Sequence, residues 1–129
     1  MMQTFNALQM LPHVQAFSEI HKEKEMIYLP AYKEGIRKTL IFDIDETMIH
    51  CLEDNDSIPD VIIKIPLDET YSDFADAGLN IRPHLVQCLV QALENYQLIA
   101  FTASDQQYAD AILDFIDPDH SIFSARLYR

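Results

Sequence analysis

Short apolar runs and helical apolar stripes alternate along the chain and predict an α/β fold with a parallel sheet. Residues 40–42 and 98–104 are apolar runs that end abruptly in polar residues, and the first is expected to be a fully buried strand. Apolar side chains at helical spacing predict helices at about residues 84–96 and 105–116, the second ending before Pro118. Open α/β sheets bind ligands at the carboxyl ends of their strands, so the polar tips of the two runs are expected to lie in a cleft.

A small β insertion is predicted after the first strand, over about residues 52–80. Its expected strands are residues 61–65 and 79–81, separated by a loop that contains Tyr71 and Phe74.

The N-terminal region is predicted to be helical and the rest to form one domain. Residues 3–28 carry apolar side chains at three-residue steps, interrupted by Pro12, which can start a second helix. We interpret residues 1–36 as a helical extension and 37–129 as the domain, with an extended segment at 122–128. Packing of the helices on the domain is the favoured interpretation, and docking to a protein partner is the alternative.

Two carboxylates and a hydroxyl, Asp43, Asp45 and Thr47, directly follow the first strand at alternate positions. In an extended chain such side chains share a face, with Cα atoms of neighbouring members roughly 6.6 Å apart. One carboxylate can then attack phosphorus while the other protonates the leaving oxygen. Because a phosphate dianion repels carboxylates, a hard divalent cation such as Mg²⁺ is implied.

Two other interpretations of this acidic segment compete with a phosphoryl-transfer site. A calcium-binding loop is rejected because Met48 and Asp54 stand where glycine and glutamate are required, and a strand precedes the segment instead of a helix. A solvated acidic turn is the commoner origin of a short Asp-x-Asp, and the tripeptide alone does not exclude it.

The second apolar run ends in Thr102 and Ser104, which predict a phosphate-binding site. Ser104 and Gln107 have the spacing of a capping box at the start of the following helix. A hydroxyl beside the free N–H groups of a helix N-terminus suits a phosphate oxygen, although a cap by itself is no evidence for a ligand.

Composition limits the classes of partner. The 129 residues, 49% of them hydrophobic, can build one core. A formal net charge of −12 without a basic stripe argues against nucleic acid or an anionic membrane as partner. Cys51 and Cys88 form no C-x-x-C, and the sequence contains no signal peptide and no apolar run of membrane-spanning length. We therefore expect an intracellular protein, nuclear or cytoplasmic.

Five elements occur in one order over residues 37 to 129: Phe42-Asp43-Ile44-Asp45-Glu46-Thr47 with His50, Ile81-Arg82-Pro83, Phe101-Thr102-Ala103-Ser104, Tyr108-Ala109-Asp110 and Arg126-Leu127-Tyr128-Arg129. In these elements the chain resembles the phosphatases of the RNA polymerase II C-terminal domain, whose small members are called NLI-interacting-factor-like phosphatases, within the haloacid dehalogenase superfamily.

The resemblance implies a Rossmann-like haloacid dehalogenase domain and a role for each matched residue. It makes Asp43 the nucleophile and a Mg²⁺ ligand, and Asp45 the general acid/base that binds Mg²⁺ through its backbone carbonyl. Thr102 would hold the phosphate and Arg129 would lie near it, and Thr47 and Ser104 are further candidates for phosphate or substrate binding. The implied substrates are phosphoserine and phosphothreonine in extended peptides, gripped with the help of the β insertion.

Two motifs of the resembled superfamily are not found in this sequence, a lysine in the third motif and an Asp-Asp or Asp-Asn pair in the fourth. The last lysine is Lys64. We therefore expect a domain that is incomplete at its C-terminus and residues 1–129 alone to be inactive. The alternative function is a catalytically incomplete, phosphatase-like subunit that binds phosphopeptides or serves a structural role. Asp105 also stands where small family members carry an apolar residue in the peptide pocket, so the peptide preference is open.

Overall fold

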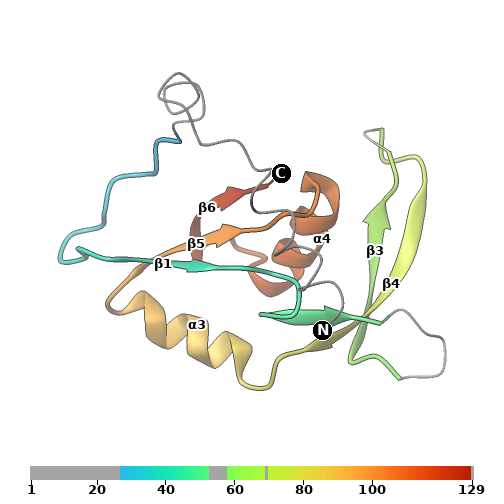
Figure 1. Cartoon of the computed structure of the whole chain (residues 1–129), viewed down its shortest axis with the longest axis horizontal. Helices are drawn as coiled ribbons and strands as arrows, with labels where there is room; N and C mark the ends of the chain where they lie inside the picture. Colours follow the sequence, from blue (N-terminus) through green and yellow to red (C-terminus); the bar gives the residue numbers. More distant parts are fainter. Residues whose placement is uncertain (1–26, 53–57, 69, 129) are drawn as a thin grey trace, which may run out of the picture.

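The computed structural model describes residues 27–52, 58–68 and 70–128 (Figure 1). The predicted N-terminal helical pattern lies outside these residues except for its last two positions, which are exposed and not helical. Arg129 lies outside them as well.

The main sheet is parallel, as the sequence predicts. It has the order β1-β5-β6, formed by Thr39–Phe42, Gln97–Phe101 and Phe123–Leu127. The helix α3, Leu85–Leu93, precedes β5, and the helix α4, Gln106–Ile116, connects β5 to β6. Strands joined through helices and paired in parallel define an α/β architecture.

A second, antiparallel sheet has the order β2-β4-β3, formed by Ile49–Cys51, Phe74–Ile81 and Val61–Pro66. The strand predicted at residues 61–65 is confirmed as β3, which extends one residue further, to Pro66. β4 is longer than predicted, so Phe74 belongs to a strand and not to the loop. The Ala, Asp and Gly residues of β4 are weak strand formers, and it is the continuous pairing with β3, from Val61 to Pro66, that extends it. The three-residue strand β2 was not predicted.

The helix α4 lies between the main sheet and β3 (Figure 1). One apolar core joins both sheets to both helices, and its fully buried members come from every layer. They include Ile44, Met48, Leu79, Leu89, Leu98, Ala109, Ile112 and Leu113.

Two expectations about burial and helix length were wrong. Ile41 in β1 is 60% exposed, because β1 lies at the edge of the described sheet and pairs only with β5. The helix expected at 84–96 ends at Leu93, where the N–H groups of Asn95 and Tyr96 both turn back to the carbonyl of Ala92. Tyr96 still packs against the core.

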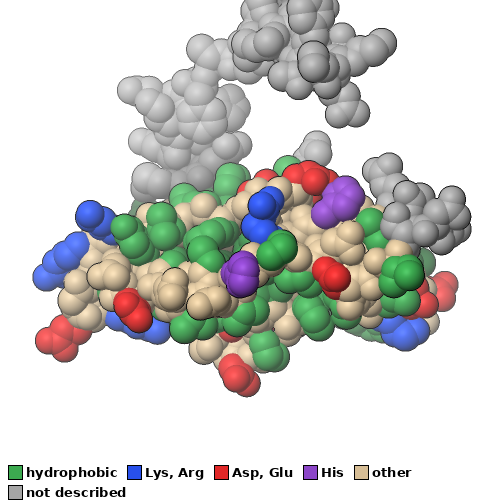
Figure 2. Space-filling model, turned by 90° about the horizontal axis from the view of Figure 1, so that it is seen from below, with side chains coloured by type: hydrophobic (Ala, Val, Ile, Leu, Met, Phe, Trp, Pro, Cys, Tyr) green, Lys and Arg blue, Asp and Glu red, His purple; other side chains and the backbone are tan. Residues whose placement is uncertain are grey.

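The face seen from below in Figure 2 mixes hydrophobic, acidic and basic side chains. α3 contributes the exposed Val86 and Val90 to the surface.

In the described part of the chain, the helices lack the length and apolar character that crossing a membrane requires.

Candidate active site

Three chain segments meet at the carboxyl edge of the main sheet. Asp43 follows β1, Thr102 follows β5 and Tyr128 follows β6. The segments are held in register because Phe42 pairs with Ala100 and the N–H of Thr102 donates to the carbonyl of Leu127 at 3.0 Å. This edge is where open α/β sheets bind their ligands.

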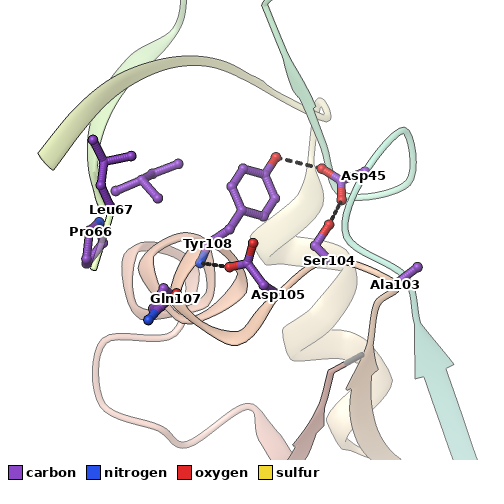
Figure 3. A pocket seen from close by; sticks show the side chains of 9 residues that line it. Asp45, Pro66, Leu67, Ala103, Ser104, Asp105, Gln107 and Tyr108 are labelled. Atoms are coloured by element: carbon purple, nitrogen blue, oxygen red, sulfur yellow. Dashed lines mark hydrogen bonds between the residues drawn. The ribbon is translucent and has the colours of Figure 1, made fainter. Parts of the chain in front are cut away.

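Both carboxylate oxygens of Asp45 accept hydrogen bonds from hydroxyl groups (Figure 3). Ser104 Oγ donates to Oδ2 at 2.8 Å, and Tyr108 Oη donates to Oδ1 at 2.6 Å. Burial, together with the hydrogen bond to Asp45, raises the pKa of Tyr108 well above its ordinary value. The tyrosine therefore remains a protonated donor, and the two hydroxyls fix the direction in which the Asp45 carboxylate points.

The turn after Asp45 is held by Arg82, a contact that the sequence did not reveal. The Arg82 guanidinium donates to the carbonyl oxygen of Glu46 at 2.9 Å and to that of Thr47. The backbone N–H of Arg82 donates to the carbonyl oxygen of Met48 at 3.0 Å. Glu46 has a φ of 57°, in the left-handed region, so the turn requires such support. Thr47 is exposed in this turn.

Asp43 opens onto a cavity of 640 Å³ at the sheet edge. Its carboxylate is exposed, and Oδ1 accepts from the N–H of Ile44 at 2.9 Å. Thr102 is only 3% exposed, and its Oγ1 accepts from the N–H of Ser104 at 3.1 Å, which leaves the hydroxyl proton able to donate to a ligand. The cavity is lined by Ile41, Asp43, Phe101, Thr102, Ala103 and Tyr128.

Asp45 opens onto a second cavity, of 670 Å³. It lies between the end of β3, the loop that follows β5, and the first turn of α4 (Figure 3). Its lining is Asp45, Ile65, Pro66, Leu67, Ala103, Ser104, Asp105, Gln107 and Tyr108. Because Ala103 lines both cavities, they adjoin, with Asp43 in one and Asp45 in the other. Thr47 lines neither.

The predicted capping box of Ser104 and Gln107 is wrong. Asp105 is the N-cap of α4, and its Oδ1 accepts from the N–H of Tyr108 at 3.1 Å. Ser104 lies one residue before the cap, and its hydroxyl is engaged by Asp45 instead. Aspartate and serine are equally good N-caps, so local sequence does not decide between them.

A charged network behind the site ties β6 to α4. Arg126 donates to Asp110 at 3.2 Å and to Asp114 at 2.6 Å, and the Tyr128 hydroxyl donates to Asp110 at 2.5 Å. Burial alone would raise the pKa of Asp110, but hydrogen bonds from Tyr128, Gln106 and Arg126 outweigh it and lower that pKa. The network holds Tyr128, a wall of the Asp43 cavity, in place.

The donor type at the site fits Mg²⁺. The Asp43 carboxylate and the Asp45 backbone carbonyl are hard oxygen donors, and Mg²⁺ typically takes one or two carboxylates and completes its shell with water and substrate phosphate. Within the described ranges there is no group of three or more His, Cys, Asp or Glu residues that could hold a metal.

The fold matches that of haloacid dehalogenase-type phosphatases. A variant of the fission yeast RNA polymerase II CTD phosphatase Fcp1 bound to beryllium fluoride superposes with a TM-score of 0.59 at 24% identity, over 71% of this chain and 29% of that one. A second structure of Fcp1 gives the same TM-score at 25% identity. These likenesses establish the α/β haloacid dehalogenase fold.

Residues 38–129 match the family model of the NLI interacting factor-like phosphatases, and the chain belongs to this CTD phosphatase-like family. Among its relatives, fission yeast nuclear envelope morphology protein 1 is 36% identical over 96 residues, 72% of this chain and 19% of that protein. CTD small phosphatase-like protein 3 of Caenorhabditis elegans is 31% identical over 97% of this chain and 42% of its own length. The chain thus spans less than half the length of these relatives.

Proposed function

We propose that this chain carries the nucleophile and the general acid of a Mg²⁺-dependent protein phosphatase that acts on phosphoserine or phosphothreonine in peptide segments. Membership of the NLI interacting factor-like family and the names of its CTD phosphatase relatives support this class of substrate. Relatives are also named for the nuclear envelope, so we propose an intracellular location associated with the nucleus.

The observation that carries the proposal is the placement of Asp43 and Asp45 in two adjoining cavities that meet at Ala103. In-line transfer requires the nucleophile and the leaving oxygen on opposite sides of phosphorus. A phosphoryl group beside Ala103 would have Asp43 on one side and Asp45 on the other. The hydroxyl of Thr102 lines the Asp43 cavity and would donate to a phosphoryl oxygen.

In the first step, an oxygen of Asp43 attacks phosphorus and the bond from phosphorus to the substrate oxygen breaks. Asp45, which must be protonated when this step begins, gives its proton to that oxygen, so the alcohol leaves neutral and Asp43 carries the phosphoryl group. In the second step, Asp45 takes a proton from water as the water oxygen attacks phosphorus, which frees Asp43 and inorganic phosphate. A bound Mg²⁺ would supply positive charge to offset the charge of the phosphate dianion.

Ser104 and Tyr108 are positioning residues in this scheme. Their hydroxyls fix the orientation of the Asp45 carboxylate in the cavity that Asp45 lines, from which it would protonate the leaving oxygen. Holding the group in this geometry contributes to the rate because its orientation is fixed before the reaction.

Replacement of Asp45 tests the proposal in the full natural chain, with a phosphoserine peptide in millimolar Mg²⁺. Asp45→Asn keeps the shape but cannot transfer the proton, so turnover should fall by roughly 10² to 10⁴. Asp119→Asn, an equal change beyond the far end of α4, should leave turnover unchanged. Wild-type turnover in Asp45→Asn would contradict the assignment. Phosphopeptide binding without turnover in the wild type would favour the non-catalytic binding module.

A further inference from the structure

The cavity on the Asp45 side has a mixed lining that indicates what enters it. One wall is apolar and consists of Ile65, Pro66 and Leu67 from the end of β3 and the residue after it. The opposite side carries the carboxylates of Asp45 and Asp105 (Figure 3). None of the described residues that line this cavity is basic.

The chemistry fixes which part of a substrate lies here. If Asp45 protonates the leaving oxygen, the chain attached to that oxygen must extend on the Asp45 side, while the phosphoryl group faces Asp43. A substrate peptide would therefore place residues next to its phosphoserine in the Asp45 cavity. At 670 Å³ the cavity has room for at least one large side chain.

Asp105 is the charged lining residue of this cavity that the proposed reaction does not use. Its carboxylate is exposed, and one oxygen accepts the N–H of Tyr108 at the N-terminus of α4. The capping role needs only an acceptor oxygen, which Asn supplies as well as Asp does. The negative charge is thus free to act on a substrate.

We propose that the Asp45 cavity binds a basic residue that flanks the phosphorylated residue, with the apolar wall of β3 covering its aliphatic stem and Asp105 pairing with its cationic head. Long basic side chains pack in this way, with the stem on apolar surface and the charge towards an acidic partner. An acidic flanking residue would be repelled by the Asp105 carboxylate. This inference rests on the proposed function and assigns the peptide preference of the same site.

Matched phosphoserine peptides test the inference in the full natural chain. Lys, Gln or Glu is placed in turn at each of the three positions on either side of the phosphoserine, and hydrolysis and binding by fluorescence anisotropy are both measured. At one or two adjacent positions, the Lys peptide should be bound and hydrolysed about fivefold to tenfold better than the Glu peptide. This range is expected when Lys forms a partly exposed ion pair and Glu is repelled at the same position. The preference should weaken with added salt.

Two variants separate the charge of Asp105 from its capping role. Asp105→Asn keeps the cap and should retain the melting temperature while reducing the Lys preference by at least half. Asp119→Asn removes one negative charge at the other end of α4, roughly 16 Å away along an 11-residue helix, and should keep the full preference.

Equal treatment of Lys and Glu peptides at every position, or an unchanged preference in Asp105→Asn, would overturn this inference and leave the proposed phosphatase function intact. A failure to bind or hydrolyse any of the phosphopeptides would overturn both.

Discussion

The hydroxyl of Tyr108 and the carboxylate of Asp45 are joined by a 2.6 Å hydrogen bond between residues 63 apart in sequence. Tyr108 sits in the first turn of α4, and Asp45 follows β1. The bond therefore connects the helix that closes one cavity to the acidic segment at the sheet edge. It makes the orientation of a candidate catalytic group depend on the packing of α4.

Tyr108→Phe should lower turnover of a phosphoserine peptide by about 10-fold to 100-fold, because Asp45 would lose one of the two donors that orient it. The fold should persist, since the ring still packs against the core. Steady-state kinetics and a thermal melt measure the two effects. Tyr96→Phe, at a half-buried tyrosine outside both cavities, is the control and should match the wild type. Equal turnover in the wild type and Tyr108→Phe would show that the bond plays no part in the reaction.

Thr102→Val should abolish most turnover at a modest cost in stability. The variant removes a hydroxyl that is expected to donate to phosphate, and it also removes the acceptor for the N–H of Ser104. The lost acceptor should cost about 1 to 3 kcal/mol of unfolding free energy. Thr102→Ser retains the hydroxyl and should retain most of the rate. If both Thr102→Val and Thr102→Ser kept the turnover of the wild type, the hydroxyl would have a structural role only.

The lowered pKa of Asp110 predicts a pH-dependent stability effect. A carboxyl group with a depressed folded-state pKa stabilises the fold above its unfolded value of 3.8, and this contribution is lost as the pH falls through the folded-state pKa. Asp110→Asn should therefore cost about 1 to 3 kcal/mol of unfolding free energy at pH 7, and the cost should shrink below pH 3.8. Urea denaturation at pH 7, 5 and 3 measures it, with Asp119→Asn as control. A loss that is independent of pH would rule out the charge of Asp110 as the source.

The sequence predicted the features that depend on local pattern. The parallel strands and their polar tips follow from apolar runs that end in Asp43 and Thr102, and the pairing of β1 with β5 brings these two tips to one edge. The prediction that Asp43 is a nucleophile and Asp45 an acid remains a prediction, as do the roles of Thr47 and Ser104. Arg129 lies outside the described residues.

The features that the sequence missed depend on contacts between distant residues or on a choice between equal local signals. Arg82 holds the Asp45 turn from 35 or more residues away, and Arg126 reaches back to α4, so neither contact has a local signature. Ser104 and Asp105 are equivalent capping residues by local preference, and the hydrogen bond from Ser104 to Asp45 decides between them. The exposure of Ile41 follows from the place of β1 in the sheet order, which an apolar run does not encode.

The most direct test of the account is hydrolysis of a phosphoserine peptide by the Asp43→Asn variant of the full natural chain in millimolar Mg²⁺. An amide cannot attack phosphorus, so we predict no turnover above background from a protein that melts as cooperatively as the wild type. Turnover by Asp43→Asn at a rate comparable with the wild type would contradict the central claim that Asp43 is the nucleophile.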